Sequence, residues 1–151
     1  MKDREELHNM AAKGDLRGLV EAMGDSQPYM RFAASDILAS QGKGAFPYLV
    51  EALSHENPDI RKGAARALGM IGDRKAVRPL LERLEKDIPG VCQFIVDALA
   101  DIGDPQVVDD LCKTTRSHSL SLRYSAVRAL GKLGDRKATP FLVEALSLIH
   151  I

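Results

Sequence analysis

Apolar residues recur along this chain at a fixed interval of 30 or 31 residues. One leucine stands in the same place of each unit, at Leu38, Leu68, Leu99 and Leu130. A glycine follows each of these leucines four residues later, at Gly42, Gly72, Gly103 and Gly134. A second leucine set comes after the glycines, at Leu49, Leu80, Leu111 and Leu142. Self-similarity with this period is typical of a solenoid, in which each unit buries its apolar face against its neighbours.

The spacing inside each unit predicts two helices. Residues 59–71 place Ile60, Ala64, Leu68 and Ile71 on one helical stripe, and Gly72 is a natural left-handed residue at the helix end. Asn-Pro and Asp-Pro pairs, at 57–58 and 104–105, have the form of an N-cap followed by proline at the first helical position. The pattern predicts about ten helices in five antiparallel pairs, at 3–14, 15–24, 29–41, 44–54, 59–71, 74–86, 90–102, 105–117, 121–133 and 136–148.

These helices predict one all-α domain, a right-handed α-α superhelix that runs over residues 1–151. Residues 1–27 form an N-terminal capping pair, and the repeats are 28–57, 58–88, 89–119 and 120–151. No linker or low-complexity segment divides the chain.

The last six residues, 146–151, break the repeat. Where a polar turn is expected, the chain reads Leu-Ser-Leu-Ile-His-Ile. This string matches the in-frame translation of a transposon-end sequencing adapter. We therefore expect 146–151 to be a non-native tail and the natural protein to continue beyond Ala145. The alternative is a genuine short tail that folds back on the final helix pair.

Composition and charge exclude several classes of partner. The 151 residues carry 21 basic and 21 acidic side chains and no tryptophan, so the concentrated positive field that nucleic-acid binding requires is missing. No apolar run approaches the ~20 residues that span a membrane, and the charged N-terminus lacks a signal-peptide core. We expect a cytoplasmic protein that binds neither nucleic acid nor membrane. Cys92 and Cys112 are expected to be buried free thiols.

The repeated motif resembles that of HEAT repeats. Pro58, Arg61, Ala64, Ala67-Leu68-Gly69 and Gly72-Asp73 occur together, and most of them return one and two units away. The short period resembles the HEAT-like subclass named from phycobilisome lyases, over essentially the whole chain. The resemblance implies that Arg31, Arg61 and Arg123 reach aspartates of nearby turns, such as Asp73, Asp104 or Asp135. In the third repeat Cys92 stands where the arginine is expected, so this repeat should be locally unstable or adapted to another role.

No catalytic, cofactor-binding or metal-ligating residue emerges from the sequence. A HEAT-like hydroxylase family binds di-iron through His-Glu pairs on its helices, but His55-Glu56 occurs once here and lies in a turn. Metal binding needs several convergent ligands, and the other histidines fall elsewhere in the repeat. We therefore expect no cofactor, no metal and no reaction by this chain.

The helices that carry the motif are expected to line the concave side of the array, and they present three rows of candidate partner-binding residues. Aligned by register, these candidates are Phe32, Lys62, Gln93 and Tyr124 in the first row, Phe94 in the second, and Asp36, Arg66, Asp97 and Arg128 in the third. The alternating charges of the third row predict either a ladder of ion pairs between units or a polar rim that selects a partner by charge. The aromatic residues either anchor a partner or fill gaps beside Gly63 and Gly69.

Two functions remain open from the sequence. The first is a non-catalytic interaction scaffold that binds a peptide or helix of another protein on its concave face. The alternative is a fragment or subunit of a bilin lyase-like or other HEAT-containing enzyme complex. An exposed C-terminal repeat would also favour end-to-end self-association.

Overall fold

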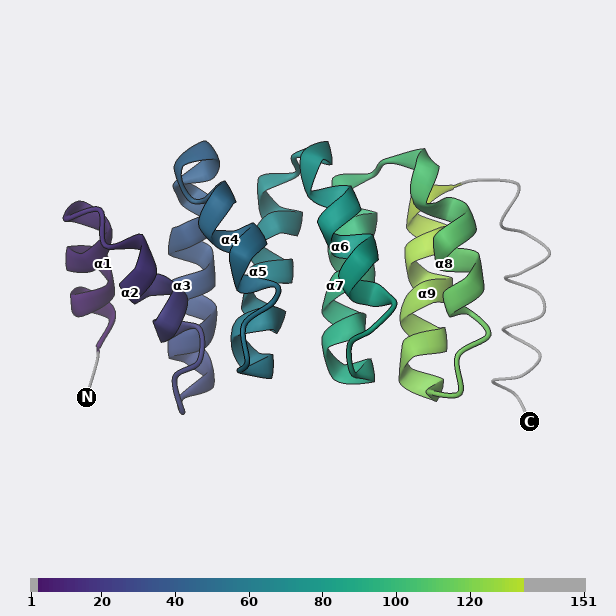
Figure 1. The fold of residues 1–151 in the computed structure, drawn as a ribbon, viewed down its shortest axis with the longest axis horizontal. Helices are drawn as coiled ribbons and strands as arrows, with labels where there is room; N and C mark the ends of the chain where they lie inside the picture. The colour runs from purple at the N-terminus through teal and green to yellow at the C-terminus, as the bar shows by residue number, and fades with distance from the viewer. Residues whose placement is uncertain (1–2, 135–151) are drawn as a thin grey trace.

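The helices form two layers that lie against each other along the whole length of the molecule. The computed structural model describes residues 3–134, and all nine α-helices of this part stand side by side in a row (Figure 1). The long helices are α3 (Pro28–Ser40), α5 (Pro58–Ile71), α7 (Pro89–Ile102) and α9 (Leu120–Leu133). The shorter ones are α1 (Arg4–Ala12), α2 (Leu16–Ala22), α4 (Phe46–Ala52), α6 (Val77–Leu84) and α8 (Val108–Thr114). This arrangement confirms the expected all-α solenoid, and the expected helix 136–148 lies outside the described residues.

The core lies between the two layers and follows the predicted register. Leu38, Leu68, Leu99 and Leu130 are all completely buried. The leucines of the short helices, Leu49, Leu80 and Leu111, are buried opposite them. Each long helix packs against the next long helix and against the short helix that precedes it in the chain, so burial of apolar surface stabilises a chain of neighbours.

The turns form for the reasons that the sequence indicates. Gly72, Gly103 and Gly134 end their long helices at φ of 75°, 75° and 67°, in the left-handed region that glycine enters without steric cost. The Asn57 side chain accepts the Asp59 N–H at 2.9 Å and so caps α5. Asp73 and Asp104 cap the next segments in the same manner.

The short helices α6 and α8 begin three residues later than predicted, and α4 begins two residues later. The segments Arg74–Ala76 and Pro105–Val107 are 3-10 turns, and the α-helices α6 and α8 start directly after them. An i→i+3 turn is a common way to begin a helix, because it satisfies donors that have no α-helical partner.

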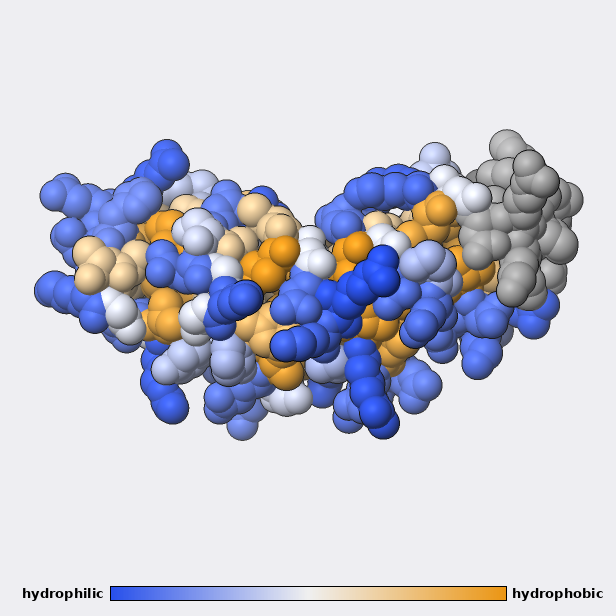
Figure 2. Space-filling view, turned by 90° about the horizontal axis from the view of Figure 1, so that it is seen from above, coloured by the Kyte–Doolittle hydropathy of each residue, from blue (hydrophilic) through white to orange (hydrophobic). Residues whose placement is uncertain are grey.

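The layer of long helices forms the hollowed side of the molecule. Seen from above, the edge that corresponds to the rear layer of Figure 1 is indented near its middle, and apolar residues run between polar rims (Figure 2). We call the solvent-facing surface of α3, α5, α7 and α9 the long-helix face.

Candidate functional site

Three ion pairs connect neighbouring helices across the long-helix face. Arg66 Nη1 of α5 lies 2.6 Å from Asp36 Oδ1 of α3. Two repeats further along, Arg128 Nη2 of α9 lies 2.9 Å from Asp97 Oδ1 of α7. The third pair, Lys132 with Asp101, also joins α9 to α7. The third row of predicted residues therefore forms ion pairs between α3 and α5 and between α7 and α9. Hydrogen bonding to Asp97 raises the pKa of Arg128 above its ordinary value, so the Arg128 guanidinium is charged at neutral pH.

Two cations of α5 lie over aromatic rings of the neighbouring helices. The guanidinium carbon of Arg66 is 5.1 Å from the centre of the Phe32 ring, on α3. The Lys62 ammonium is 6.0 Å from the centre of the Phe94 ring, on α7. Such contacts between a cation and an aromatic face are attractive, by about 0.5–1 kcal/mol at exposed sites. Each of the two rings therefore has a cation of α5 beside it.

The predicted aromatic residues do not have equal access to solvent. Tyr124 and Phe32 are 59% and 44% exposed, whereas Phe94 packs against the core and is half-buried. Gln93, beside Phe94 on α7, is also half-buried. The structure therefore brings Phe32, Lys62, Arg66 and Phe94 together, while Tyr124 lies further along the array on α9. Their role in binding stays a prediction.

The arginine near the start of α3, α5 and α9 contacts the loop that precedes each of these helices. Arg61 Nη1 donates to the carbonyls of His55 and Glu56 at 2.8 and 3.0 Å. Arg31 and Arg123 bind carbonyls in the equivalent loops. The aspartate partner expected for Arg61 is wrong: Asp73 caps the next turn, and Arg61 reaches Asp87 instead. The Asp73 carboxylate accepts the backbone N–H of Lys75, two residues further along the chain, as aspartates in turns commonly do.

Cys92 occupies the arginine position of the third repeat. Its thiol donates to the carbonyls of Leu84 and Asp87, at 3.5 and 3.4 Å. The thiol therefore supplies hydrogen bonds to these carbonyls in place of the arginine found in the other repeats. Burial raises the pKa of this thiol, and the nearby Asp87 carboxylate raises it further. Cys92 is therefore a neutral, buried thiol, as the sequence predicted.

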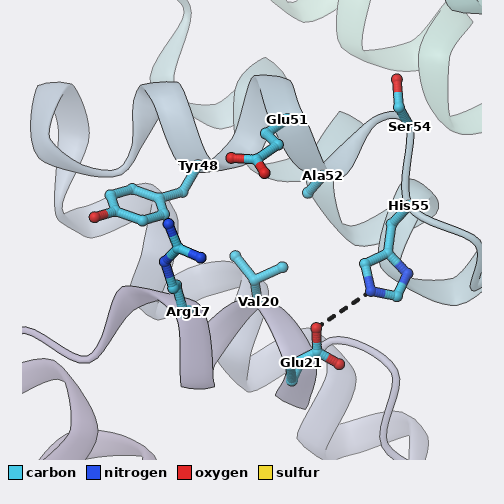
Figure 3. A pocket seen from close by; sticks show the side chains of 8 residues that line it. All are labelled: Arg17, Val20, Glu21, Tyr48, Glu51, Ala52, Ser54 and His55. Atoms are coloured by element: carbon cyan, nitrogen blue, oxygen red, sulfur yellow. Dashed lines mark hydrogen bonds and ion pairs between the residues drawn. The ribbon is translucent and has the colours of Figure 1, made fainter.

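A groove between α2 and α4, on the short-helix layer, was not predicted. It has a volume of about 420 Å³, with Val20 and Ala52 along it, Arg17 beside Tyr48 at one end and Glu21 and His55 at the other (Figure 3). His55 Nε2 and Glu21 Oε1 lie 3.2 Å apart. These residues come from two repeats and share no motif, so only the packing of α2 on α4 brings them together.

Further properties of the described residues concern the binding of metal ions and the spanning of membranes. Between residues 3 and 134 no three or more His, Cys, Asp or Glu side chains are arranged to hold a metal ion. No helix in the same part of the chain is long and apolar enough to cross a membrane.

The family follows from comparison with known proteins. A family model described as HEAT repeats matches residues 16–94 and 79–148. The chain belongs to the HEAT-repeat family. Human deoxyhypusine hydroxylase superposes with a TM-score of 0.66 at 24% identity, over 85% of this chain and 46% of that one. At this identity the likeness is one of fold alone.

Several curated relatives carry names from bilin chemistry. The phycocyanobilin lyase subunit beta of Pseudanabaena tenuis is 35% identical over 121 residues, which cover 78% of this chain and 43% of that protein. The bilin biosynthesis protein PecE of Mastigocladus laminosus is 25% identical, over 78% of this chain and 56% of that protein. The phycobilisome maturation protein of Synechococcus elongatus is 29% identical, over 79% and 57%. The chain thus spans about half the length of these relatives, and its HEAT-like repeats are of the phycobilisome lyase type.

These names correct the first function expected from the sequence. A non-catalytic scaffold that binds a peptide or helix is contradicted, because the relatives are named for bilin lyases and for phycobilisome maturation. The alternative, a part of a bilin lyase-like complex, agrees with them. The repeat pattern could not decide between the two, because it encodes packing that serves many functions.

Proposed function

We propose that this chain is part of a bilin lyase-like subunit and that its long-helix face contacts the bilin. The observation that carries the proposal is the set of relatives named as lyase subunit, bilin biosynthesis protein and phycobilisome maturation protein. From the sequence alone we expect no reaction by this chain. We propose instead that it takes part in a lyase-type reaction.

The chemistry of the long-helix face supports this proposal. A bilin is an open-chain tetrapyrrole, a flat conjugated molecule that carries carboxylate side chains. The face offers exposed aromatic surface at Phe32 and Tyr124, and it offers the cations Lys62 and Arg66 next to aromatic rings. Aromatic faces favour flat conjugated ligands by stacking, and guanidinium and ammonium groups favour carboxylates.

A protein partner belongs to the same proposal. The relatives include a phycocyanobilin lyase subunit alpha as well as a subunit beta, and the alpha subunit is 38% identical over 66 residues, which cover 44% of this chain. We expect this chain to work with a second HEAT-repeat subunit, which would supply groups that the present repeats lack. End-to-end association through the last repeat depends on residues outside the described part, and it stays a prediction.

Binding of phycocyanobilin to the purified chain tests the proposal. We expect saturable changes in the visible absorption of the bilin and an induced circular dichroism signal, since a chiral protein site orders a flexible chromophore. Phe32→Ala and Tyr124→Ala should each weaken binding, and both residues are exposed enough to be replaced without loss of the fold. Tyr48→Ala, in the α2–α4 groove of the other layer, is the matched control. If the bilin does not bind, or if only Tyr48→Ala weakens binding, the proposal is wrong.

A further inference from the structure

A small recess lies on the long-helix face where α3, α5 and α7 meet. Its volume is about 120 Å³, less than a third of the 420 Å³ of the α2–α4 groove. It is lined by Arg31 and Phe32 of α3, by Asp59, Lys62, Gly63 and Arg66 of α5, and by Phe94 of α7. This volume fits a carboxylate with a short carbon stem, and it is too small for a whole tetrapyrrole.

The aromatic residues give the recess two walls. Phe32 and Phe94 stand on α3 and α7, on opposite sides of α5. Each ring has one cation of α5 against its face, Arg66 at 5.1 Å and Lys62 at 6.0 Å. The recess therefore combines positive charge with flat apolar surface.

The charges around the recess do not cancel. Three cations line or border it, Arg31, Lys62 and Arg66, against the two carboxylates of Asp36 and Asp59. Arg66 uses one nitrogen, Nη1, for Asp36, and its guanidinium has further N–H donors for a second acceptor. The Lys62 ammonium is 4.0 Å from Asp59 Oδ1, which is too long for a strong hydrogen bond. One excess positive charge and unused donors therefore remain.

We propose that this recess binds a carboxylate carried by a flat aromatic or conjugated group, between the side chains of Lys62 and Arg66. The carboxylate replaces the solvent around these two cations, and the attached π system lies against Phe32 or Phe94. The inference deepens the proposed function and rests on it for the natural ligand, since the carboxylate would then be a bilin side chain. The recess itself can be tested without a bilin.

The first experiment titrates the full 151-residue chain with 3-phenylpropionate and follows backbone amide resonances by NMR. We expect saturable shifts centred on Gly63, with a dissociation constant on the order of 1 mM, as for a small ligand with few contacts. 3-Phenylpropionamide has the same shape without the charge and should bind much more weakly.

Three variants locate the site. Lys62→Gln and Arg66→Gln should each weaken 3-phenylpropionate binding by about tenfold, because a hydrogen bond to a charged group is lost. Arg128→Gln is the matched control: Arg128 has the register of Arg66 and an equivalent ion pair with Asp97, but it lies on α9 away from the recess. Its binding should equal that of the parent chain. Thermal unfolding checks that all three variants remain folded.

The outcomes separate this inference from the proposed function. The recess is not a carboxylate site if the amide binds as well as the acid, or if the Lys62→Gln, Arg66→Gln double variant binds like the parent. If 3-phenylpropionate binds as expected and phycocyanobilin does not bind, the recess stands and the bilin function fails. If phycocyanobilin binds equally to the parent and the double variant, the bilin function stands and the recess does not anchor it.

Discussion

Arg61 of α5 reaches Asp87, in the loop before α7, through two hydrogen bonds of 2.8 and 3.0 Å. The Asp87 side chain is only 1% exposed, and Arg83 of α6 donates to the same carboxylate at 2.7 Å. The Ile88 N–H, at the start of α7, is a further donor. One buried carboxylate thus joins α5, α6 and α7 at the centre of the array.

Replacing Arg61 with alanine should destabilise the fold strongly. The variant leaves Asp87 buried with one arginine fewer and frees the His55 and Glu56 carbonyls. Loss of one partner of a buried ion pair is costly, and we expect a loss of about 2–4 kcal/mol in the free energy of unfolding. Urea unfolding followed by circular dichroism measures it. Arg78→Ala, which breaks the exposed pair with Glu82, is the control and should have little effect. Equal effects of the two variants would show that the Asp87 cluster has no special role.

The same carboxylate should make stability depend on acid pH. Burial by itself raises the pKa of Asp87, but hydrogen bonds from Arg61, Arg83 and Ile88 outweigh it and hold the pKa below its ordinary value of 3.8. Because the folded-state pKa is depressed, the stabilisation is complete above the unfolded-state pKa of about 3.9. It is lost as the pH falls through the folded-state value. The stability difference between the parent and Asp87→Asn should therefore be large at pH 7 and shrink below about pH 4. A difference that stays constant from pH 7 to pH 3 would contradict this.

The Asp87 cluster also shows which features of the fold could be predicted from the sequence and which could not. The leucine register, the glycine helix ends and the caps at Asn57 and Asp104 follow from local backbone chemistry and helical spacing, and each was found as expected. The ion pairs of the third row depend only on register, so they too could be anticipated. The partner of Arg61 could not, because Asp87 is 26 residues away and has no counterpart in the motif.

The candidate site shows the same division. The register placed Phe32, Lys62, Phe94 and Arg66 on one face, but the recess between them depends on how closely α3, α5 and α7 approach. Arg31 and Asp59, which complete its lining, were not among the predicted binding residues. The α2–α4 groove was missed because its residues follow no repeat. The resemblance of the motif offered a bilin lyase-like complex only as the alternative, and the relatives decided in its favour, since periodicity reports packing and leaves function open.

Two glycines at the same place in the repeat should respond in opposite ways to alanine. A Cβ at Gly69, on α5, would lie 2.9 Å from the backbone Cα of Ala98 on α7, so Gly69→Ala should force the two helices apart and cost about 1–3 kcal/mol. A Cβ at Gly131, on α9, would meet no described atom within 4 Å. Gly131→Ala should therefore stabilise the chain by about 0.5–1 kcal/mol, because alanine restricts the unfolded chain and favours the helix. Thermal melts of the two variants compare them directly. A stable Gly69→Ala variant would mean that α5 and α7 pack less closely than the structure shows.

Cys92 should resist thiol reagents until its loop opens. The thiol is 3% exposed, and burial together with the nearby Asp87 carboxylate raises its pKa, so little of the reactive thiolate forms near neutral pH. In a Cys112→Ala background, we expect Ellman's reagent to modify Cys92 in the native chain far more slowly than in urea. Addition of Arg61→Ala should accelerate the reaction, because Arg61 anchors the Asp87 loop whose carbonyl accepts from the Cys92 thiol. Gly131→Ala in the same background leaves that loop intact and should not. Fast modification of the chain that retains Arg61 would show that the loop opens while the Arg61–Asp87 pair is present, and it would contradict the role of that pair in holding the loop closed.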